Sequence, residues 1–363
     1  MRSSVPDIHN LVENIKALSP AQKQLFERIF HLGIAEGHLV LPETMHRWVK
    51  EYFGSPEVVT TQEVVKITNL VTFEGALFNK LRSARPIEEP GGFQTVSESG
   101  RDPLCNPERD TPEDIFGRVE GDFYVTASNI AKYDGSHGIV IFKGHSPMEF
   151  SIEKICEYLD VGRRWAEKAH AANPLDKYYF FIWNCMWRAG ASLSHGHAQV
   201  MLTRDMHYAK VEGLRRAALS YNERYRSNYF DDLYRVHSSV GCGLEREGVK
   251  VIAYLTPLKE REVILMAGGF DASLKERIYE VLECYRSEMK VKSFNLALCT
   301  PPLGEVKESW EGFPVLVRLV DRGSPESRVS DIGAMELFAS SIIAGNPLEV
   351  AEMLKKSLTK SSS

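Results

Sequence analysis

Residues 184–199 read Asn184-Cys-Met-Trp-Arg-Ala-Gly-Ala-Ser-Leu-Ser-His-Gly-His-Ala-Gln199. The end of this stretch fits a β-strand, in which side chains two apart face the same side, so His195, His197 and Gln199 line one face. Upstream, Gly190 and Ser192 belong to a turn of small residues whose N–H groups and hydroxyl can approach an anion closely. Three polar groups on one face, with small residues on the other, are typical of a site and not of a core.

This polar row indicates phosphate chemistry. A neutral imidazole is a good nucleophile near pH 7, and His197, at the centre of the row, is the best candidate to attack phosphorus. Gln199 offers an amide donor but no titratable proton, so it can stabilise charge without activating water. The row therefore predicts an intermediate that waits for an acceptor other than water. The competing interpretations are a structural histidine and a metal-binding His-x-His pair.

The composition of the chain narrows its class. Its 363 residues, 43% of them hydrophobic, predict two or three folding units. With 44 Lys plus Arg against 49 Asp plus Glu, there is no overall basic field to recruit nucleic acid or a membrane surface. The apolar runs are too short to span a bilayer, and six scattered cysteines predict reduced thiols. A soluble cytoplasmic enzyme is expected.

The hydrophobic spacing predicts an α+β protein. Residues 6–54 have apolar positions at helical spacing, with Ser19-Pro20 as a helix start, and predict a small helical domain. From residue 64 the order strand, strand, long helix, strand, strand occurs twice. The expected helices span residues 152–172, 272–291 and 347–358; the expected strands span residues 64–71, 123–127, 138–142, 178–183, 198–202, 249–254, 262–266, 294–299 and 314–320. The predicted units are 1–62 (helical extension), 63–206 (first α+β unit) and 207–363 (second α+β unit).

Residues 86–116 are rich in Pro, Gly, Glu and Asp, and predict a long loop within the first unit. Cys105 is its one chemically unusual member. His137 lies just before the expected strand at 138–142, and we interpret it as a turn histidine; the alternative is a residue that borders the site.

The 184–199 stretch resembles the active-site strand of the galactose-1-phosphate uridylyltransferase branch of the histidine triad (HIT) superfamily. The family pattern is Asn, then Gly-x-Ser, then His-x-His-x-Gln, and the form found here is closest in motif to ADP-glucose phosphorylase-like members. Three further segments fit: Thr72-Phe-Glu-Gly-Ala-Leu-Phe-Asn79 followed by Arg82-Ser-Ala-Arg-Pro86, residues 138–145, and Gly333-Ala-Met-Glu-Leu337 with Asn346-Pro347. The resemblance covers roughly residues 64–358.

The resemblance implies two HIT-like repeats, each an antiparallel sheet with helices, and a ping-pong reaction. His197 would be the nucleophile that forms a nucleotidyl-histidine, with His195 and Gln199 as the other members of the catalytic row. The implied substrate-binding residues are Asn184, Gly190 and Ser192 at the phosphates, Arg82 and Arg85 at substrate phosphates across a homodimer interface, Asn129 and Leu104 on the nucleobase side, and Glu336 and Arg328 at the sugar phosphate. Surface arginines, a turn asparagine and a packed leucine are the alternatives for Arg82, Arg85, Asn129 and Leu104.

The resemblance also implies a structural zinc site. Its ligand positions correspond here to Asp102, Cys105, His145 and His195, and carboxylate, thiolate and imidazole are all zinc ligands. The alternative for Cys105 is a plain buried thiol. A second metal site in some family members needs histidines in the second repeat, but no histidine follows His237, so we expect no iron at Glu212.

The leading hypothesis is a nucleotidyltransferase or phosphorylase that acts on a nucleoside-diphosphate sugar or a hexose 1-phosphate. The partners would be a nucleotide sugar and a sugar phosphate or inorganic phosphate. One alternative is a dinucleoside polyphosphate phosphorylase or hydrolase, and another is a non-catalytic nucleotide-binding regulatory protein. The base and the sugar stay open, because an asparagine such as Asn129 can pair with uracil or adenine.

Overall fold

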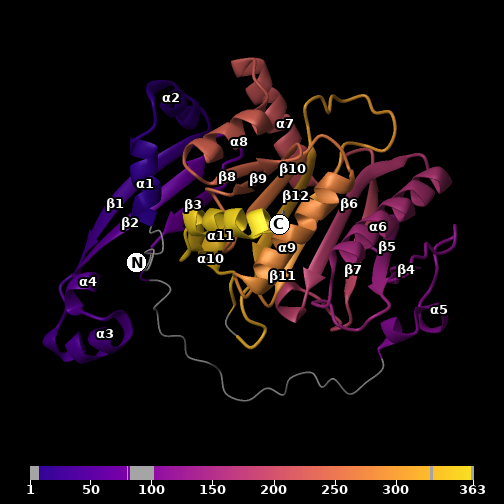
Figure 1. Cartoon of the computed structure of the whole chain (residues 1–363), viewed down its shortest axis with the longest axis horizontal. Helices are drawn as coiled ribbons and strands as arrows, with labels where there is room; N and C mark the ends of the chain where they lie inside the picture. Colours follow the sequence, from indigo (N-terminus) through magenta and orange to yellow (C-terminus); the bar gives the residue numbers. More distant parts are fainter. Residues whose placement is uncertain (1–7, 80, 82–101, 328–329, 361–363) are drawn as a thin grey trace.

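The computed structural model describes residues 8–79, 81, 102–327 and 330–360 (Figure 1). Within these residues the strands form a nine-stranded and a four-stranded sheet. The large sheet has the strand order β4-β5-β7-β6-β11-β12-β10-β9-β8, and each neighbouring pair is antiparallel. Its strands are β4 (Tyr124–Ser128), β5 (Ser136–Phe142), β6 (Asp176–Cys185), β7 (His197–Arg204), β8 (Gly243–Arg246), β9 (Val249–Ala253), β10 (Val263–Ala267), β11 (Phe294–Cys299) and β12 (Val315–Asp321). The predicted α+β class is confirmed.

The two halves of the large sheet have the same internal order. One half runs β4, β5, α6 (Ile152–Ala172), β6, β7 along the chain, and the other runs β9, β10, α9 (Ala272–Ser287), β11, β12. In each half, the third strand along the chain (β6 or β11) lies at the centre of the sheet, and the first (β4 or β9) lies farthest from the centre among the four. The halves meet where β6 pairs with β11, with Asn184 opposite Asn295. Polar residues from both halves therefore come together at the middle of the sheet.

Helices α6 and α9 cover one face of this sheet and contact each other (Figure 1). The predicted helix at 152–172 has those bounds, and the Ser151 hydroxyl caps it by accepting from the Lys154 N–H. Trp165 of α6 is fully buried over β5, where a Cβ on Gly138 would lie 2.6 Å from the indole. Because the helices fill this face, the polar row of β7 faces the opposite side.

The N-terminal part is less helical than predicted. It contains α1 (Ile8–Lys16), α2 (Pro20–Ile29), a 3₁₀ turn η1 (Glu43–Met45), α3 (His46–Phe53) and α4 (Pro56–Thr60), but also strand β1 (Phe30–His38). The prediction of a helical segment throughout 6–54 is wrong at β1. Gly33 and Gly37 disfavour a helix there, while Leu32 and Ile34 alternate along a strand that pairs with β2 (Thr61–Asn69). The start of α2 at Ser19-Pro20 is confirmed, with a capping box to Gln22.

The four-stranded sheet has the order β1-β2-β3-β13, with β3 (Gly75–Phe78) and β13 (Ser341–Ile343) parallel. The strand predicted at 64–71 therefore exists as β2, but it belongs to this small sheet and not to the sheet of the polar row. Strand β13 and helix α11 (Pro347–Lys360), which contacts α1, bring the C-terminal part of the chain back to the N-terminal part. Helices α7 (Ala209–Tyr225), α8 (Tyr229–Ser239) and α10 (Ala334–Phe338) were not predicted.

Arg318 of β12 ties the two sheets together. Its Nε donates to Glu262 at 2.6 Å, and its Nη1 donates to Glu74 at 2.7 Å. Glu74 precedes β3 of the small sheet, and its other carboxylate oxygen accepts from the Tyr254 hydroxyl. This partly buried network fixes the small sheet against the second half of the large one.

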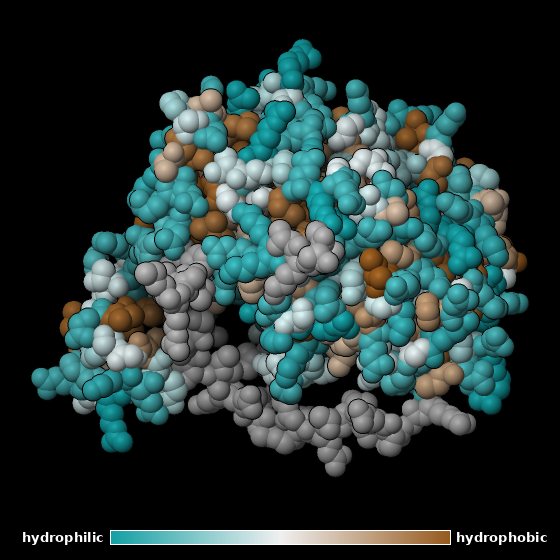
Figure 2. Space-filling model, in the orientation of Figure 1, coloured by the Kyte–Doolittle hydropathy of each residue, from teal (hydrophilic) through white to brown (hydrophobic). Residues whose placement is uncertain are grey.

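The surface over the helices is mainly hydrophilic (Figure 2). Apolar side chains gather at the end of the β1–β2 ribbon where α3 and α4 lie, and Trp48 and Tyr52 there are exposed. In the described residues, we find no helix with the length and apolar character needed to cross a membrane.

Candidate active site and metal centre

The polar row lies on the face of β7 opposite to the helices. Ala198 and Val200 are buried in the main core, so His197 and Gln199, which alternate with them, face away from it. Strand β7 begins at His197, and His195 lies in the turn before it. Gln199 is opposite Ile182 of β6, which places Asn184, two residues further on, on the same face. The predicted grouping of His197, Gln199 and Asn184 is thus present.

Gly196 fits the close approach between this turn and β5. A Cβ on residue 196 would lie 2.7 Å from the ring of Phe142. The Gly196 carbonyl accepts from the Phe142 N–H at 2.9 Å, and the Gly196 N–H donates to the His145 carbonyl at 3.0 Å. A side chain at this position would push His195 and His197 out of place.

His197 is held with one ring nitrogen engaged and the other available. Its Nδ1 lies 2.8 Å from the His195 carbonyl oxygen, which can only accept, so Nδ1 carries a proton and donates. Burial lowers the pKa of His197, which is 9% exposed, and so favours the neutral ring. In the neutral ring Nε2 then has the lone pair, and among the described residues it has no hydrogen-bond partner. This arrangement suits a nucleophile.

Gln199 is oriented by His137, a contact that the sequence interpretation missed. The Tyr133 N–H donates to His137 Nδ1 at 2.9 Å, so the neutral ring has its proton on Nε2 and donates to Gln199 Oε1 at 2.9 Å. Burial lowers the pKa of His137 and keeps the ring neutral. Among the residues that the structure describes, the Gln199 NH₂ group has no acceptor and is available as a donor. Counting alternate residues back from Ile139 on β5 would have placed His137 on the site face.

The turn after β6 is closed by its own backbone hydrogen bonds. The Ala189 and Ala191 N–H groups donate to the Met186 carbonyl and the Gly190 N–H donates to the Trp187 carbonyl, so these predicted anion donors are already engaged. Residues Trp187–Ala189 form the 3₁₀ turn η4, which ends at Gly190 in the left-handed region with φ of 96°. A Cβ on Gly190 would have Asn184 Nδ2 as its nearest neighbour, at 3.9 Å. The positive φ favours glycine at this position, and the Asn184 amide lies beside it. Ser192 is exposed in the following bend.

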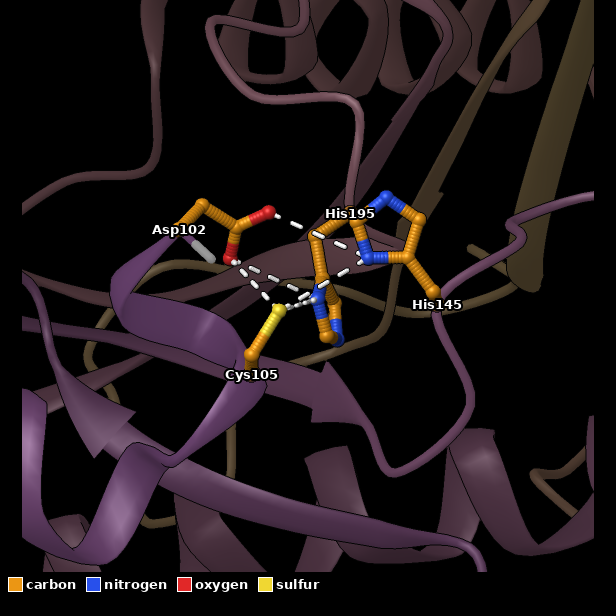
Figure 3. Close-up of side chains that lie close together, drawn as sticks. All are labelled: Asp102, Cys105, His145 and His195. Carbon is orange, nitrogen blue, oxygen red and sulfur yellow. Dashed lines mark hydrogen bonds and ion pairs between the residues drawn. The ribbon is translucent and has the colours of Figure 1, made fainter. Parts of the chain in front are cut away.

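Asp102, Cys105, His145 and His195 come together, as predicted (Figure 3). Asp102 and Cys105 belong to the turn η3 (Pro103–Cys105) and its cap, before the short helix α5 (Pro107–Asp110). One ligand atom from each residue lies within 4.8 Å of all the others. Cys105 Sγ is 3.6 Å from His195 Nδ1, 3.7 Å from Asp102 Oδ1 and 3.8 Å from His145 Nδ1. This cluster is a possible metal site.

The distances around Cys105 Sγ are close to those of a zinc site, while the four ligand atoms as a set spread over up to 4.8 Å. With bonds of about 2.0–2.3 Å, the ligands at the corners of a zinc tetrahedron are about 3.3–3.8 Å apart. The two histidine Nδ1 atoms are 3.4 Å and 3.9 Å from the Asp102 carboxylate oxygens, close to the same range. His195 Nε2 donates to the Phe142 carbonyl at 2.7 Å, which leaves Nδ1 unprotonated and directed at the cluster. All four residues thus present suitable donors.

A small apolar cluster, separate from the main core, flanks His197. It consists of Leu104, Val125, Ala127 and Ile141, with Ile139 and Leu193 packed against it. Ile141 is opposite His197 in the β5–β7 ladder and so shares its face. Leu104 is buried here, as the packed-leucine interpretation expected; its contact with a nucleobase stays a prediction.

Asn129 and Glu336 each make a local hydrogen bond with a backbone N–H. Asn129 Oδ1 accepts from the Ala131 N–H. Its Nδ2 lies 3.2 Å from His137 Nε2, and because that nitrogen carries the proton donated to Gln199, the two donors make no hydrogen bond. Glu336 caps α10 by accepting from the Gly333 N–H at 2.8 Å. Their predicted substrate contacts stay predictions. Arg82, Arg85 and Arg328 lie outside the described residues.

Glu212 of α7 is a buried carboxylate paired with two arginines. It accepts from Arg215 at 2.6 and 2.8 Å and from Arg216 at 2.6 Å. These hydrogen bonds, led by that of Arg215, lower the pKa of Glu212 from 4.5 to about 2. The stabilisation is therefore fully present above about pH 4.5 and is lost as the pH falls towards 2.

We expect Glu212→Gln to lower the free energy of unfolding by about 2–3 kcal/mol at pH 7, because it leaves the buried Arg215 without its counter-charge. The difference from the wild type should shrink as the pH falls from 5 to 3. Urea denaturation at several pH values measures it. A difference of the same size at pH 7 and pH 3 would show that the ion pair is not its source.

The comparisons with known proteins agree with this geometry at the level of the fold. The structure is similar to that of an ADP-glucose phosphorylase from Arabidopsis thaliana with bound ADP-glucose, with a TM-score of 0.60, 17% sequence identity, and coverage of 79% of this chain and 96% of that one. A GalT-like protein from Arabidopsis thaliana gives a TM-score of 0.59 at 16% identity, covering 80% of this chain and 97% of that one. A uridylyltransferase gives 0.57 at 14% identity, covering 81% and 98%.

The fold is thus an α+β fold that this chain shares with these solved structures. More narrowly, its structural neighbours are ADP-glucose phosphorylase and GalT-like uridylyltransferases, and the resemblance drawn from the sequence is confirmed for the fold. No protein-family model matches the chain, and no curated protein matches it.

Proposed function

We propose that this protein is a nucleotidyltransferase or phosphorylase that acts on a nucleoside-diphosphate sugar through a covalent nucleotidyl-His197. The observation that carries the proposal is the state of His197: a buried neutral ring with Nδ1–H on the His195 carbonyl and Nε2 available, on the same face as Asn184 and Gln199. The shared fold with an ADP-glucose phosphorylase and a uridylyltransferase supports it.

The reaction has two displacements. In the first, the Nε2 lone pair attacks the α-phosphorus, a P–N bond forms, and the P–O bond to the β-phosphate breaks, so that a sugar 1-phosphate leaves with the electron pair. In the second, a phosphate oxygen of the acceptor attacks the same phosphorus, and the P–N bond breaks to return neutral His197. No external acid is needed, because both leaving groups are weak bases.

Fixed hydrogen-bond donors stabilise the negative charge that develops on the α-phosphate oxygens. The Gln199 NH₂, freed by His137, and the Asn184 NH₂ beside Gly190 are neutral donors in place before the reaction. Arg82 and Arg85 are proposed to add positive charge from outside this row. Since Gln199 cannot take a proton from water, the nucleotidyl group is protected from hydrolysis.

We also propose that the Asp102, Cys105, His145 and His195 cluster holds zinc in a structural role. Bound zinc would fix the side chain of His195 and supply no reacting group. The backbone carbonyl of His195 holds His197 Nδ1, so order in this cluster bears directly on the orientation of the nucleophile.

The division of the chain into units is also part of the proposal. We propose that residues 63–206 and 207–363 contain two HIT-like repeats, which the matching strand order of the two halves supports. We also propose that the protein forms a homodimer and lies in the cytoplasm.

The test is direct detection of the intermediate. Purified protein incubated with ADP-glucose or with UDP-glucose is expected to gain the mass of one nucleotidyl group, located on His197 by peptide mass spectrometry. The adduct should persist in buffer and be released by inorganic phosphate or a hexose 1-phosphate. The compound that releases it identifies the acceptor.

Other outcomes would contradict the proposal. Rapid release in buffer without an acceptor would favour a hydrolase, and cleavage of a dinucleoside tetraphosphate alone would favour the polyphosphate activity. Thermal stabilisation by nucleotides without any adduct would favour a binding protein.

A further inference from the structure

A chain of polar side chains crosses the middle of the large sheet, from the second half to the first. It consists of Asp331, Arg322, Asn295 and Asn184. Arg322 Nε and Nη2 donate to the two Asp331 oxygens at 2.8 and 3.0 Å, and Arg322 Nη1 donates to Asn295 Oδ1 at 2.7 Å. Asn295 Nδ2 donates to Asn184 Oδ1 at 2.7 Å. Each member thus touches the next.

The donor and the acceptor of every hydrogen bond in this row of polar side chains follow from which groups can only donate. A guanidinium can only donate, so the Asn295 atom that faces Arg322 is its carbonyl oxygen. The Asn295 NH₂ must then face the other way, where it also donates to the Ala189 carbonyl at 2.8 Å. This donor can be accepted only by the carbonyl oxygen of the Asn184 amide. The Asn184 NH₂ therefore points away from Asn295 and lies beside Gly190.

The same elements hold the turn that carries Gly190. Asn295 binds its Ala189 carbonyl, and Arg188 in the turn donates from Nε to the Arg322 carbonyl and from Nη1 to the Ser327 carbonyl, each at 3.1 Å. Arg322 is 16% exposed and Asp331 is 20% exposed, so solvent competes little for these bonds. This turn lies in the first half of the sheet, but residues of the second half hold it.

We propose that Asn295 and Arg322 are positioning residues, which hold the Asn184 amide with its NH₂ group towards the α-phosphate. This inference rests on the proposed nucleotidyl transfer at His197. Asn184 alone could turn its amide by half a rotation at almost no cost in shape, and its oxygen would then face the phosphate. Asn295 prevents that rotation because it offers only a donor, and Arg322 prevents Asn295 from rotating.

The sharpest test reverses the polarity of Asn295 without changing its shape. In Asn295→Asp the carboxylate can only accept, so the Asn184 amide is expected to rotate and present its oxygen to the phosphate. We expect the single-turnover rate of adduct formation from ADP-glucose or UDP-glucose, whichever the wild type uses, to fall roughly 10- to 100-fold. Asn228→Asp, the same exchange at the N-cap of α8, keeps a capping oxygen and should leave the rate unchanged.

A double-mutant cycle separates positioning from a general structural effect. If Asn295 acts through Asn184, Asn295→Asp has no further effect on the rate in an Asn184→Ala background. Equal losses from Asn295→Asp in both backgrounds, or a wild-type rate in the single variant, would overturn the inference.

Arg322→Met provides a second route if Asn295→Asp does not fold. It leaves both amides in place but removes the donor that fixes Asn295, and the rate should again fall, with Arg322→Lys recovering part of it. A wild-type rate in Arg322→Met would overturn the role of Arg322. If the wild type itself forms no adduct, the proposed function fails instead, and the two failures are distinguishable.

Discussion

Replacing His197 with asparagine is expected to abolish nucleotidyl transfer, with the rate of adduct formation falling on the order of 10⁴-fold or more. Asparagine can place its NH₂ near the position of Nδ1 and keep the bond to the His195 carbonyl, but it has no atom at the position of Nε2. The variant therefore removes the nucleophile while preserving the local fold. Mass spectrometry after incubation with ADP-glucose or UDP-glucose measures the loss.

The matched control for this variant is His38→Asn, at the exposed end of β1. It should form the adduct at the wild-type rate. If His197→Asn still carries a full nucleotidyl group after the same incubation, His197 is not the nucleophile and the proposed mechanism is wrong.

The second large effect concerns the metal centre. Cys105→Ala removes one of four ligands, and we expect the zinc affinity to fall at least about 100-fold, since a three-ligand site has lost its only thiolate. Asp102→Cys should act in the opposite direction, because a second thiolate binds zinc more tightly than a carboxylate. Competition with a zinc chelator, followed by metal analysis of the protein, gives both affinities.

Cys156→Ala is the control, because Cys156 is a half-buried thiol on α6, away from the cluster. It should bind zinc like the wild type. Wild-type protein purified with zinc present should hold about one ion per chain if the four residues act as one tetrahedral site. Protein that stays free of zinc, or a Cys105→Ala variant with unchanged affinity, would refute the metal centre.

Much of the candidate site follows from local sequence rules. Alternation along one strand is enough to place His197 and Gln199 on one face, and the register of β7 against β6 brings Asn184 to it. Contacts between distant strands do not follow from such rules. The bond from Asn295 to Asn184 depends on the pairing of β6 with β11, and the sequence contains no local signal for which strands of the two halves meet.

The fold likewise has parts that the local sequence predicts and parts that depend on pairing between distant strands. The bounds of α6 and β11 could be predicted because a long amphipathic period and a short apolar run between breaks are clear signals. The sequence predicts helix at β1 because Leu25, Ile29 and Leu32 continue the helical spacing of α2 into it. Pairing with β2 overrides that spacing, and the parallel contact of β13 with β3 joins residues far apart in the chain.

The pairing of β6 with β11 has a consequence for the folding of this protein during its synthesis. Strand β6 is complete long before β11 has been synthesised, so the nascent first half has an open edge next to the turn η4. Open edges of apolar strands such as β6 readily pair with other chains. The first half therefore cannot complete its own sheet, and a truncated product that stops after β7 would be prone to aggregate.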